Sequence, residues 1–509
     1  MKQADSLFTL IKSLSKTEKR YFKCYALMHG KSESNYISLF NAIEKQNNYD
    51  EALIKKQFAG KTFVKQFSVT KNYLYHLVLK SMELYRQANS VDAEIRSLLN
   101  RSDVLYEKAM YKECTTIIEK AHTIAKKHEL RNSILEILRL KRRVLWKMLD
   151  LKKIGPIEAE ESDVLDTIKQ NKLLGDLSGK IALNYFTKGK RGAQKDVLKK
   201  YLSDPLLENE KQIKTFTGNV HFLQCHIFYN MFIGNEEKLF ELSKKMALHY
   251  VSNPFMIQYD TYSYLVTLNN IISSCLWQKK VKELKFWIDH LQEAEKFARN
   301  KTSQIYYWQL NYHILNYYNL LGEFETSRQH CESKVLKKME AYEHGLNQKD
   351  LFVLCNSMAN TYFGTGDFHS ALTWLNKINN QITMQLEPDL RSHAKIFFLL
   401  VHFELKHFDL IPYLIKSTYR FLLKMERLTP FQKAFLGFLK QFLKKEFDRK
   451  QLQDLFILFK QDVEKIFKNK SGEQAFEQFD YISWLESKIE NRPFAEIVKE
   501  KSTALVQRS

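Results

Sequence analysis

The sequence predicts a protein built almost entirely of α-helices. It holds only 15 glycines and 7 prolines among 509 residues, whereas average usage is roughly 7 % and 5 %. Sandwiches, barrels and doubly wound sheets need these residues at their many turns, and nucleotide sites need glycine-rich loops. The chain is 44 % hydrophobic and 13 % aromatic, so it has enough apolar surface for a core, and wholesale disorder is excluded.

The first 90 residues carry local signals for a compact helical unit. Ser15 and Glu18 have the spacing of a capping box, in which each side chain accepts a hydrogen bond from the other residue's amide. Asp50 is expected to cap a short helix that stops by Gly60, and Ser68 is expected to cap a longer helix after it.

The clearest motif of the chain lies at residues 358–372. An apolar–small pair is followed by a tyrosine, a glycine, an aromatic residue and an alanine, at Met358, Ala359, Tyr362, Gly366, Phe368 and Ala371. The small residues allow two helices to approach closely, and the glycine supplies a left-handed turn between them. This pattern resembles a tetratricopeptide repeat, and the best-matching unit spans 352–385.

The same offsets recur more weakly along the chain. They predict turns between paired helices at Gly189, Gly234, Lys279, Gly322, Gly366 and Lys406. The period is about 44 residues, whereas a tetratricopeptide repeat has about 34. HEAT or armadillo units, with a period of roughly 40–47 residues, are the architectural alternative. The Tyr–Gly–aromatic–Ala spacing favours the tetratricopeptide family. A further turn followed by a second helix is expected at Ala109.

The resemblance implies an all-α right-handed superhelix, an α-solenoid of antiparallel helix pairs. Such a stack exposes apolar surface at both ends, so helical caps are expected there. We therefore divide the chain into an N-terminal helical domain or cap at 1–90, tetratricopeptide-like helical repeats at 91–429 and a C-terminal helical cap at 430–509.

The resemblance also places a binding surface on the inner helices, where this family binds partners. The expected positions are uncharged and mostly amides: Asn269, Ser273, Tyr312, Asn316, Asn356 and Asn360. An amide can donate to and accept from the backbone of an extended peptide. The alternative is that asparagine merely tolerates exposure in an asparagine-rich chain.

The net charge of +21 favours an acidic protein or peptide partner in a basic groove. Lysines and arginines are concentrated in two local segments. We interpret each segment as a solvated helix face, and the alternative is a phosphate-binding surface. The basic residues are Arg139, Lys141, Arg142, Arg143, Lys147, Lys152 and Lys153 in the first segment, and Lys188, Lys190, Arg191, Lys195, Lys199 and Lys200 in the second.

We therefore expect a non-enzymatic interaction scaffold or adaptor. The alternative is a transcriptional or other regulator whose N-terminal domain contacts nucleic acid while the repeats act as a sensor. That alternative rests on Thr70-Lys71-Asn72-Tyr73, which opens a helix in a basic segment.

The sequence shows no motif for a cofactor or a metal, so neither is expected. His221 with Cys225, and His402 with His407, are close enough in sequence to share a ligand face, but two ligands do not make a metal site. The six cysteines form no CxxC pair, and no apolar run reaches the length of a membrane span. We expect a cytoplasmic protein with no membrane partner.

Overall fold

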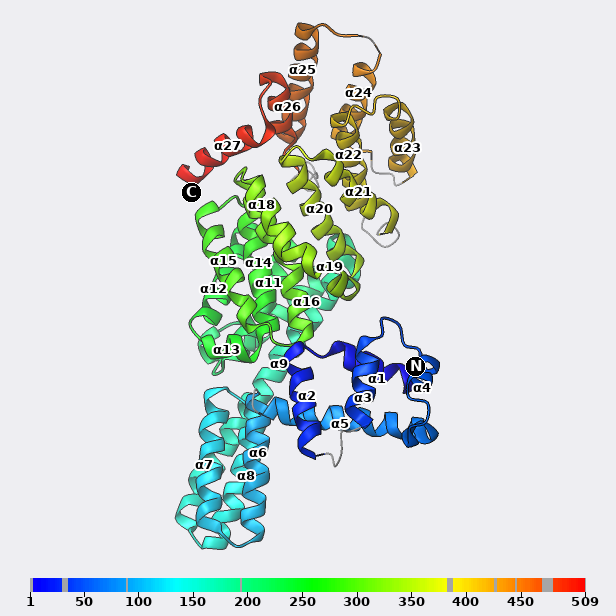
Figure 1. Cartoon of the computed structure of the whole chain (residues 1–509). Coiled ribbons are helices and arrows are strands. Elements are labelled where there is room, and N and C mark those ends of the chain that lie inside the picture. Colours follow the sequence, from blue (N-terminus) through cyan, green and yellow to red (C-terminus); the bar gives the residue numbers. More distant parts are fainter. Residues whose placement is uncertain are drawn as a thin grey trace. The chain divides into compact units, whose positions relative to one another are not determined.

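The computed structural model describes residues 3–29, 35–87, 90–192, 195–381, 388–424, 428–444, 446–468 and 479–508. These residues form helices and turns and contain no strand, which confirms the predicted all-α class (Figure 1). No helix among them is both long enough and apolar enough to cross a bilayer. The chain forms two compact units: unit 1 holds residues 1–175 and 211–219, and unit 2 holds 176–210 and 220–509.

Unit 1 contains the N-terminal helices and the hairpins that follow them. Its elements are α1 (Gln3–Ser13), α2 (Lys16–His29), α3 (Asn35–Lys45), α4 (Glu51–Gln57), η1 (Thr62–Gln66), α5 (Phe67–Gln87), α6 (Val91–Glu107), α7 (Tyr111–Lys127), α8 (Arg131–Met148), η2 (Leu151–Lys153) and the first part of α9 (Ile154–Gly192). Two further elements are divided between the units, η4 (Glu210–Gln212) and α11 (Phe216–Ile233).

Unit 2 contains the remaining elements. After the rest of α9 they are α10 (Lys195–Leu202), η3 (Pro205–Leu207), α12 (Glu236–Val251), α13 (Pro254–Tyr259), α14 (Thr261–Trp277), α15 (Val281–Glu293), η5 (Ala294–Phe297), α16 (Lys301–Gln309), α17 (Asn311–Leu320), α18 (Phe324–His330), η6 (Cys331–Leu336), α19 (Lys337–Tyr342), η7 (Glu343–Gly345), α20 (Gln348–Gly364), α21 (Phe368–Gln381), α22 (Pro388–Glu404), α23 (Ile411–Lys424), α24 (Pro430–Phe442), α25 (Arg449–Lys468), α26 (Tyr481–Glu490) and α27 (Phe494–Arg508).

The helix caps predicted at the start of unit 1 are confirmed, with one exception. The Ser15 amide donates to Glu18 Oε2 at 2.7 Å, and the Glu18 amide donates to Ser15 Oγ at 3.2 Å, which confirms the capping box. Asp50 accepts from the amide of the third residue of α4, as expected. Ser68 as an N-cap is wrong, because α5 already begins at Phe67, directly after η1, so Ser68 lies inside the first turn.

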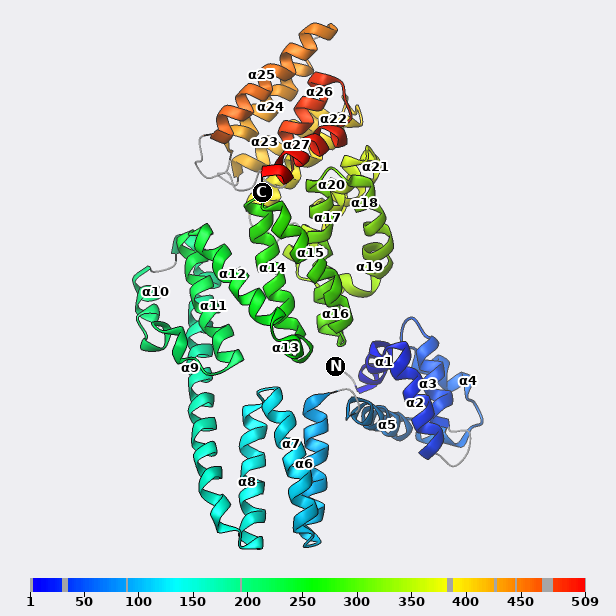
Figure 2. The same cartoon turned by 90° about the vertical axis from the view of Figure 1, so that its left-hand side faces the viewer.

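Two groups of buried apolar side chains stabilise unit 1. The first joins α1, α2, α3 and α5 through residues such as Phe22, Phe40 and Leu74, all fully buried. The second joins α6, α7, α8 and the start of α9 through Ile118 and Ile137. Figure 2 shows α6, α7 and α8 side by side, each packed on the next.

Five of the six predicted turns have left-handed backbone at the predicted residue. The φ angles are +72° at Gly234, +53° at Lys279, +73° at Gly322, +78° at Gly366 and +57° at Lys406. Ala109, with φ of +58°, confirms the additional turn before α7. Beyond four of these turns, the next helix packs against the preceding one: α15 on α14, α18 on α17, α21 on α20 and α23 on α22.

The hydrogen bonds at Gly322 show how these turns close. The amide of Glu323 donates to the carbonyl of Tyr318 at 2.9 Å, and the amide of Gly322 donates to the carbonyl of Asn319 at 3.1 Å. This pair of bonds is the Schellman motif, which satisfies the last carbonyls of a helix. The same pair closes the turns at Lys279 and Lys406, where a side chain in this conformation costs about 1–2 kcal/mol.

The turn predicted at Gly189 is wrong. This residue lies inside α9, which continues to Gly192. A glycine permits a left-handed turn but does not impose one, and a single glycine within a helix costs only about 1 kcal/mol relative to alanine.

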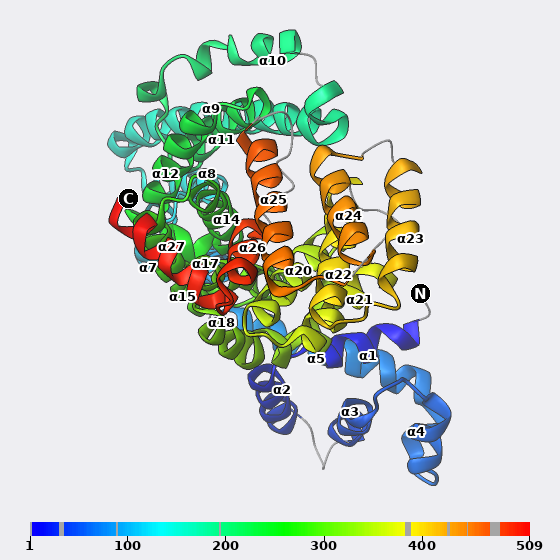
Figure 3. The same ribbon diagram turned by 90° about the horizontal axis from the view of Figure 1, so that it is seen from above.

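A large apolar core in unit 2 runs from α16 to α26. It includes fully buried aromatic side chains from helices far apart in sequence, among them Trp308, Phe363, Phe397, Phe431 and Trp484. Helices α23, α24 and α25 follow one another side by side (Figure 3), and α26 packs on α25. The C-terminal helices therefore share one core with the helices before them.

Candidate binding sites

The six residues of the predicted stripe lie on three helices that contact one another. Helix α14 carries Asn269 and Ser273, α17 carries Tyr312 and Asn316, and α20 carries Asn356 and Asn360. Helix α17 packs against both α14 and α20. Ser273 is exposed, Asn356 is buried, and the other four are partly buried. We refer to these six residues as the amide stripe.

The structure brings three stripe residues together in one hydrogen-bond network. Tyr312 donates from its hydroxyl to Asn269 Oδ1 at 2.8 Å, and it also hydrogen-bonds to Ser273. His313 Nε2 lies 3.0 Å from the same Asn269 oxygen, so it must be the donor nitrogen. Burial lowers the pKa of His313 to about 3, which keeps the ring neutral. Asn269 and Tyr312 therefore join α14 to α17.

The α20 part of the stripe differs, because it holds a buried acceptor without a donor. Asn356 is 6 % exposed, and its Oδ1 has no hydrogen-bond partner within the described part of the chain. On the neighbouring α17, Nδ1 of His313 is likewise buried without a partner. A buried polar atom left without a partner costs about 1–3 kcal/mol. A new hydrogen bond to either atom would remove this cost.

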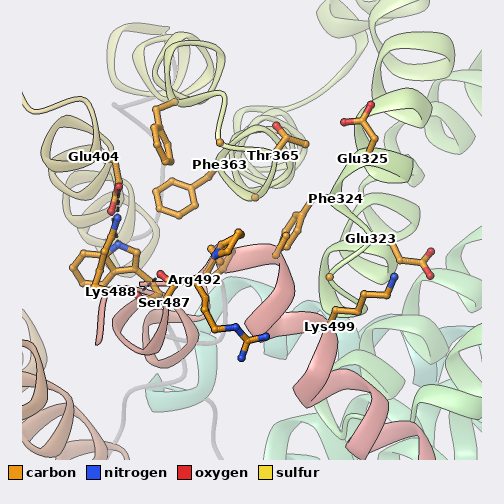
Figure 4. Close-up of a pocket in the computed structure, with 18 of the residues that line it drawn as sticks. Glu323, Phe324, Glu325, Phe363, Thr365, Glu404, Ser487, Lys488, Arg492 and Lys499 are labelled. Atoms are coloured by element: carbon orange, nitrogen blue, oxygen red, sulfur yellow. Dashed lines mark hydrogen bonds and ion pairs between the residues drawn. The ribbon is translucent and has the colours of Figure 1, made fainter. Parts of the chain in front are cut away.

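A second candidate site is a pocket of about 790 Å3 in unit 2. Figure 4 shows the turns after α17 and α20 on one side of it and residues of α26 and α27 on the other. Its aromatic lining includes Phe324, Phe363, Phe368, Trp484 and Phe494. Several of these rings contact one another, for example Phe324 and Phe494 with centroids 5.5 Å apart.

Ion pairs position the charged groups that line this pocket. Glu404 is nearly buried and binds both Lys488 Nζ and Trp484 Nε1 at 2.6 Å. Arg492 forms ion pairs with three carboxylates, at Glu490, Glu496 and Glu500. These contacts join α26 to α22 and fix the segment that leads into α27.

Two glycines allow the walls of the pocket to form. A Cβ on Gly322 would lie 2.6 Å from the Lys499 backbone nitrogen and 2.9 Å from the Ala495 carbonyl oxygen. A Cβ on Gly364 would overlap the ring of Phe324. The spacing in the sequence predicts only a turn at Gly322 and gives no sign of this pocket. The only sequence signal was the pair of glycines: Gly364 accommodates Phe324, and the role of Gly322 depends on α27, which lies far later in the chain.

Several basic residues of the first segment, at 139–153, form ion pairs. Lys141 binds Glu119 and Arg142 binds Glu161, both at 2.6 Å. Arg143 binds Asp103 at 2.9 Å and lies over the ring of Tyr106, and Lys153 binds Asp150. In the second segment, the side chains of Lys188, Lys190, Arg191 and Lys195 lie outside the described residues, and Lys199 and Lys200 are exposed.

Three of the four residues proposed to open a nucleic-acid-binding helix make contacts within unit 1. Thr70 is buried and donates to the Gln66 carbonyl at 3.1 Å, and Lys71 pairs with Glu51. Tyr73 is 52 % exposed, and its ring contacts that of Tyr36 in a tilted arrangement with centroids 4.6 Å apart. The nucleic-acid alternative stays a prediction.

The paired residues considered as metal ligands make other contacts. His221 Nδ1 bonds to Gln224 Oε1 at 3.2 Å, and burial raises the pKa of the Cys225 thiol to about 12. His402 and His407 share a hydrogen bond between their Nδ1 atoms at 2.9 Å. Among the described residues, no three histidine, cysteine or acidic side chains are grouped so that they could hold a metal ion.

Comparisons with known proteins found no similar protein. No family model matches the sequence. The curated proteins contain no match, and neither do the solved structures.

Proposed function

We propose that this chain is a tetratricopeptide-like scaffold that binds segments of partner proteins along the amide stripe. In this proposal the helix–turn–helix pairs repeat about every 44 residues and stack as a right-handed superhelix, with α14, α17 and α20 on the inner side. The five left-handed turns at the expected residues support this arrangement, since four of them lead into a helix that packs on the preceding one.

The observation that carries the proposal is the unsatisfied amide oxygen of Asn356. Buried polar atoms in folded proteins nearly always have partners. The partly buried amides of Asn316 and Asn360 would bond to the backbone of a bound segment, and a backbone N–H of that segment would supply the missing donor once the Asn356 side chain turns outward. Asn269 and Tyr312, which bond to each other, would shape the site rather than contact the partner directly.

The charge balance bears on the choice of partner. All six stripe residues are uncharged, so they would recognise the peptide backbone of a partner segment rather than its charged side chains. The net charge of +21 would attract acidic segments and speed their association. The proposed setting is the cytoplasm, where thiols stay reduced. Four buried cysteines have pKa values raised to about 12 by burial, which fits this setting: Cys225, Cys275, Cys331 and Cys355.

The test is affinity purification with the full chain and the double variant Asn316→Ala/Asn360→Ala. The matched control is Asn72→Ala/Asn132→Ala, which makes the same change at two exposed helix positions of unit 1. We expect the stripe variant to lose specific partners that the control retains, with equal helical circular dichroism in both. Equal partner recovery by the wild type and both variants would refute the stripe as the binding surface.

A further inference from the structure

Five large apolar side chains are exposed at one end of the hairpins in unit 1. They are 42 %, 56 %, 39 %, 77 % and 53 % exposed at Met110, Trp146, Met148, Leu149 and Leu151, respectively. Their turns, between α6 and α7 and between α8 and α9, lie at the same end of the helices (Figure 2). Thr115 Oγ1, near the start of α7, lies 3.9 Å from Met148 Sδ. We call these five residues the apolar tip.

The most exposed of them also has an unfavourable backbone conformation. Leu149 closes the Schellman turn after α8 with φ of +55°. The amide of Asp150 donates to the Leu145 carbonyl at 3.1 Å, so the turn is fully formed. Glycine or asparagine would adopt this conformation at lower cost. The fold of unit 1 alone therefore gives no reason for a leucine at this position.

Basic side chains surround the apolar tip. Residues 101–113 and 139–153 together contain ten lysines and arginines and four acidic residues. Lys108, Lys112, Lys147 and Lys152 are exposed within a few residues of the tip. The acidic residues here include Glu107 and Glu113, which are also exposed, and Asp103 and Asp150, which form the ion pairs with Arg143 and Lys153.

The placement of the tip restricts what can cover it. Its side chains come from the ends of helical hairpins and are 39–77 % exposed, which suits a broad surface as the partner. A tryptophan with leucines and methionines suits the boundary between lipid headgroups and acyl chains. Lysines beside them can extend their stems along the apolar surface and place their ammonium groups at lipid phosphates.

We propose that the apolar tip inserts into the surface of an anionic membrane. Its insertion requires no membrane-spanning helix, and the expectation of no membrane partner rested only on the lack of a spanning segment. The tip lies in unit 1 and the amide stripe lies in unit 2, so the two proposals stand or fall separately.

Vesicle binding tests the proposal with the full chain. Lipid vesicles of phosphatidylcholine alone, or with phosphatidylglycerol added, are titrated with the wild type and with Leu149→Asn/Leu151→Asn. Asparagine suits the left-handed turn, so the variant should fold, and circular dichroism checks this. Leu53→Gln/Val69→Thr is the control, because both residues are exposed apolar side chains of unit 1 outside the tip.

We expect the wild type and the control to sediment with anionic vesicles and the tip variant to bind at least about tenfold more weakly, because two leucines no longer leave water. Trp146 is the most exposed of the six tryptophans. Its emission should shift to shorter wavelength on binding and become protected from iodide quenching.

Three results would overturn the proposal. The first is that the wild type stays in solution when anionic vesicles sediment; a protein would then be the partner that covers the tip. The second is equal binding by the tip variant. The third is sedimentation without a change at Trp146, since lysines elsewhere would then account for the binding.

Discussion

Replacing Gly322 with alanine should destabilise unit 2 far more than the same change at Gly366. Both glycines close left-handed turns, with φ of +73° and +78°, so alanine adds a backbone cost of about 1–2 kcal/mol at either site. At Gly366 the new methyl group would meet nothing within 4 Å. At Gly322 it would lie within 2.6–2.9 Å of backbone atoms of Lys499 and Ala495 on α27.

The difference between the two variants measures how tightly α27 packs on the turn. Backbone atoms of a helix cannot move aside as a side-chain end can, so α27 must shift or detach. Overpacking of this kind costs typically about 1–3 kcal/mol. We therefore expect a loss of about 2–5 kcal/mol for Gly322→Ala, against about 1–2 kcal/mol for Gly366→Ala.

Urea denaturation gives the free energies of unfolding, and hydrogen exchange locates the change. Exchange should accelerate at residues 494–508 in Gly322→Ala and remain at the wild-type rate there in Gly366→Ala. The hydrogen bond from Ser502 Oγ to the Leu321 carbonyl should be lost with the contact. Equal free energies for the two variants, with unchanged exchange in α27, would refute this reasoning.

Three further predictions concern the turns, the pocket and pH. Lys279→Gly should raise the urea midpoint. The strain of a residue with a side chain in left-handed backbone conformation, about 1–2 kcal/mol, is removed, and this gain exceeds the free-energy cost of the more flexible unfolded chain; a lower midpoint would contradict this. Glu404→Ala should cost about 2–4 kcal/mol and speed exchange in α26, because Trp484 Nε1 and Lys488 lose their acceptor; exchange at the wild-type rate would contradict this. Burial lowers the pKa of His313 to about 3. The contribution of the neutral His313 ring to stability is therefore complete above the usual histidine pKa and is lost as the pH falls below that usual value. The loss approaches about 1.4 kcal/mol per pH unit, and in urea melts between pH 7 and 5 His313→Gln should depend less on pH than the wild type.

Short-range signals in the sequence predicted local structure well. The capping box at Ser15 and the left-handed turns at Gly322 and Gly366 depend on residues within one or two turns of helix. Lys279 and Lys406 show that spacing is informative even where glycine is missing. Gly189 shows the limit, because the same residue type is tolerated within a continuing helix.

The predicted site was only partly accessible to the same reasoning. Helical spacing placed Asn269 and Tyr312 on corresponding faces of their helices, but it could not show that they bond to each other across those helices. It equally could not show that Asn356 is buried with an unsatisfied oxygen, because burial depends on neighbouring helices.

The all-helical class and five of the six predicted turns were settled by the sequence alone, because both follow from backbone preferences and from hydrogen bonds that close within a few residues. The pocket beside Gly322, the network at Asn269 and the exposure of Leu149 were decided only by tertiary packing. Each depends on which distant side chains come near, and contacts between elements far apart in the chain leave no short-range pattern to read.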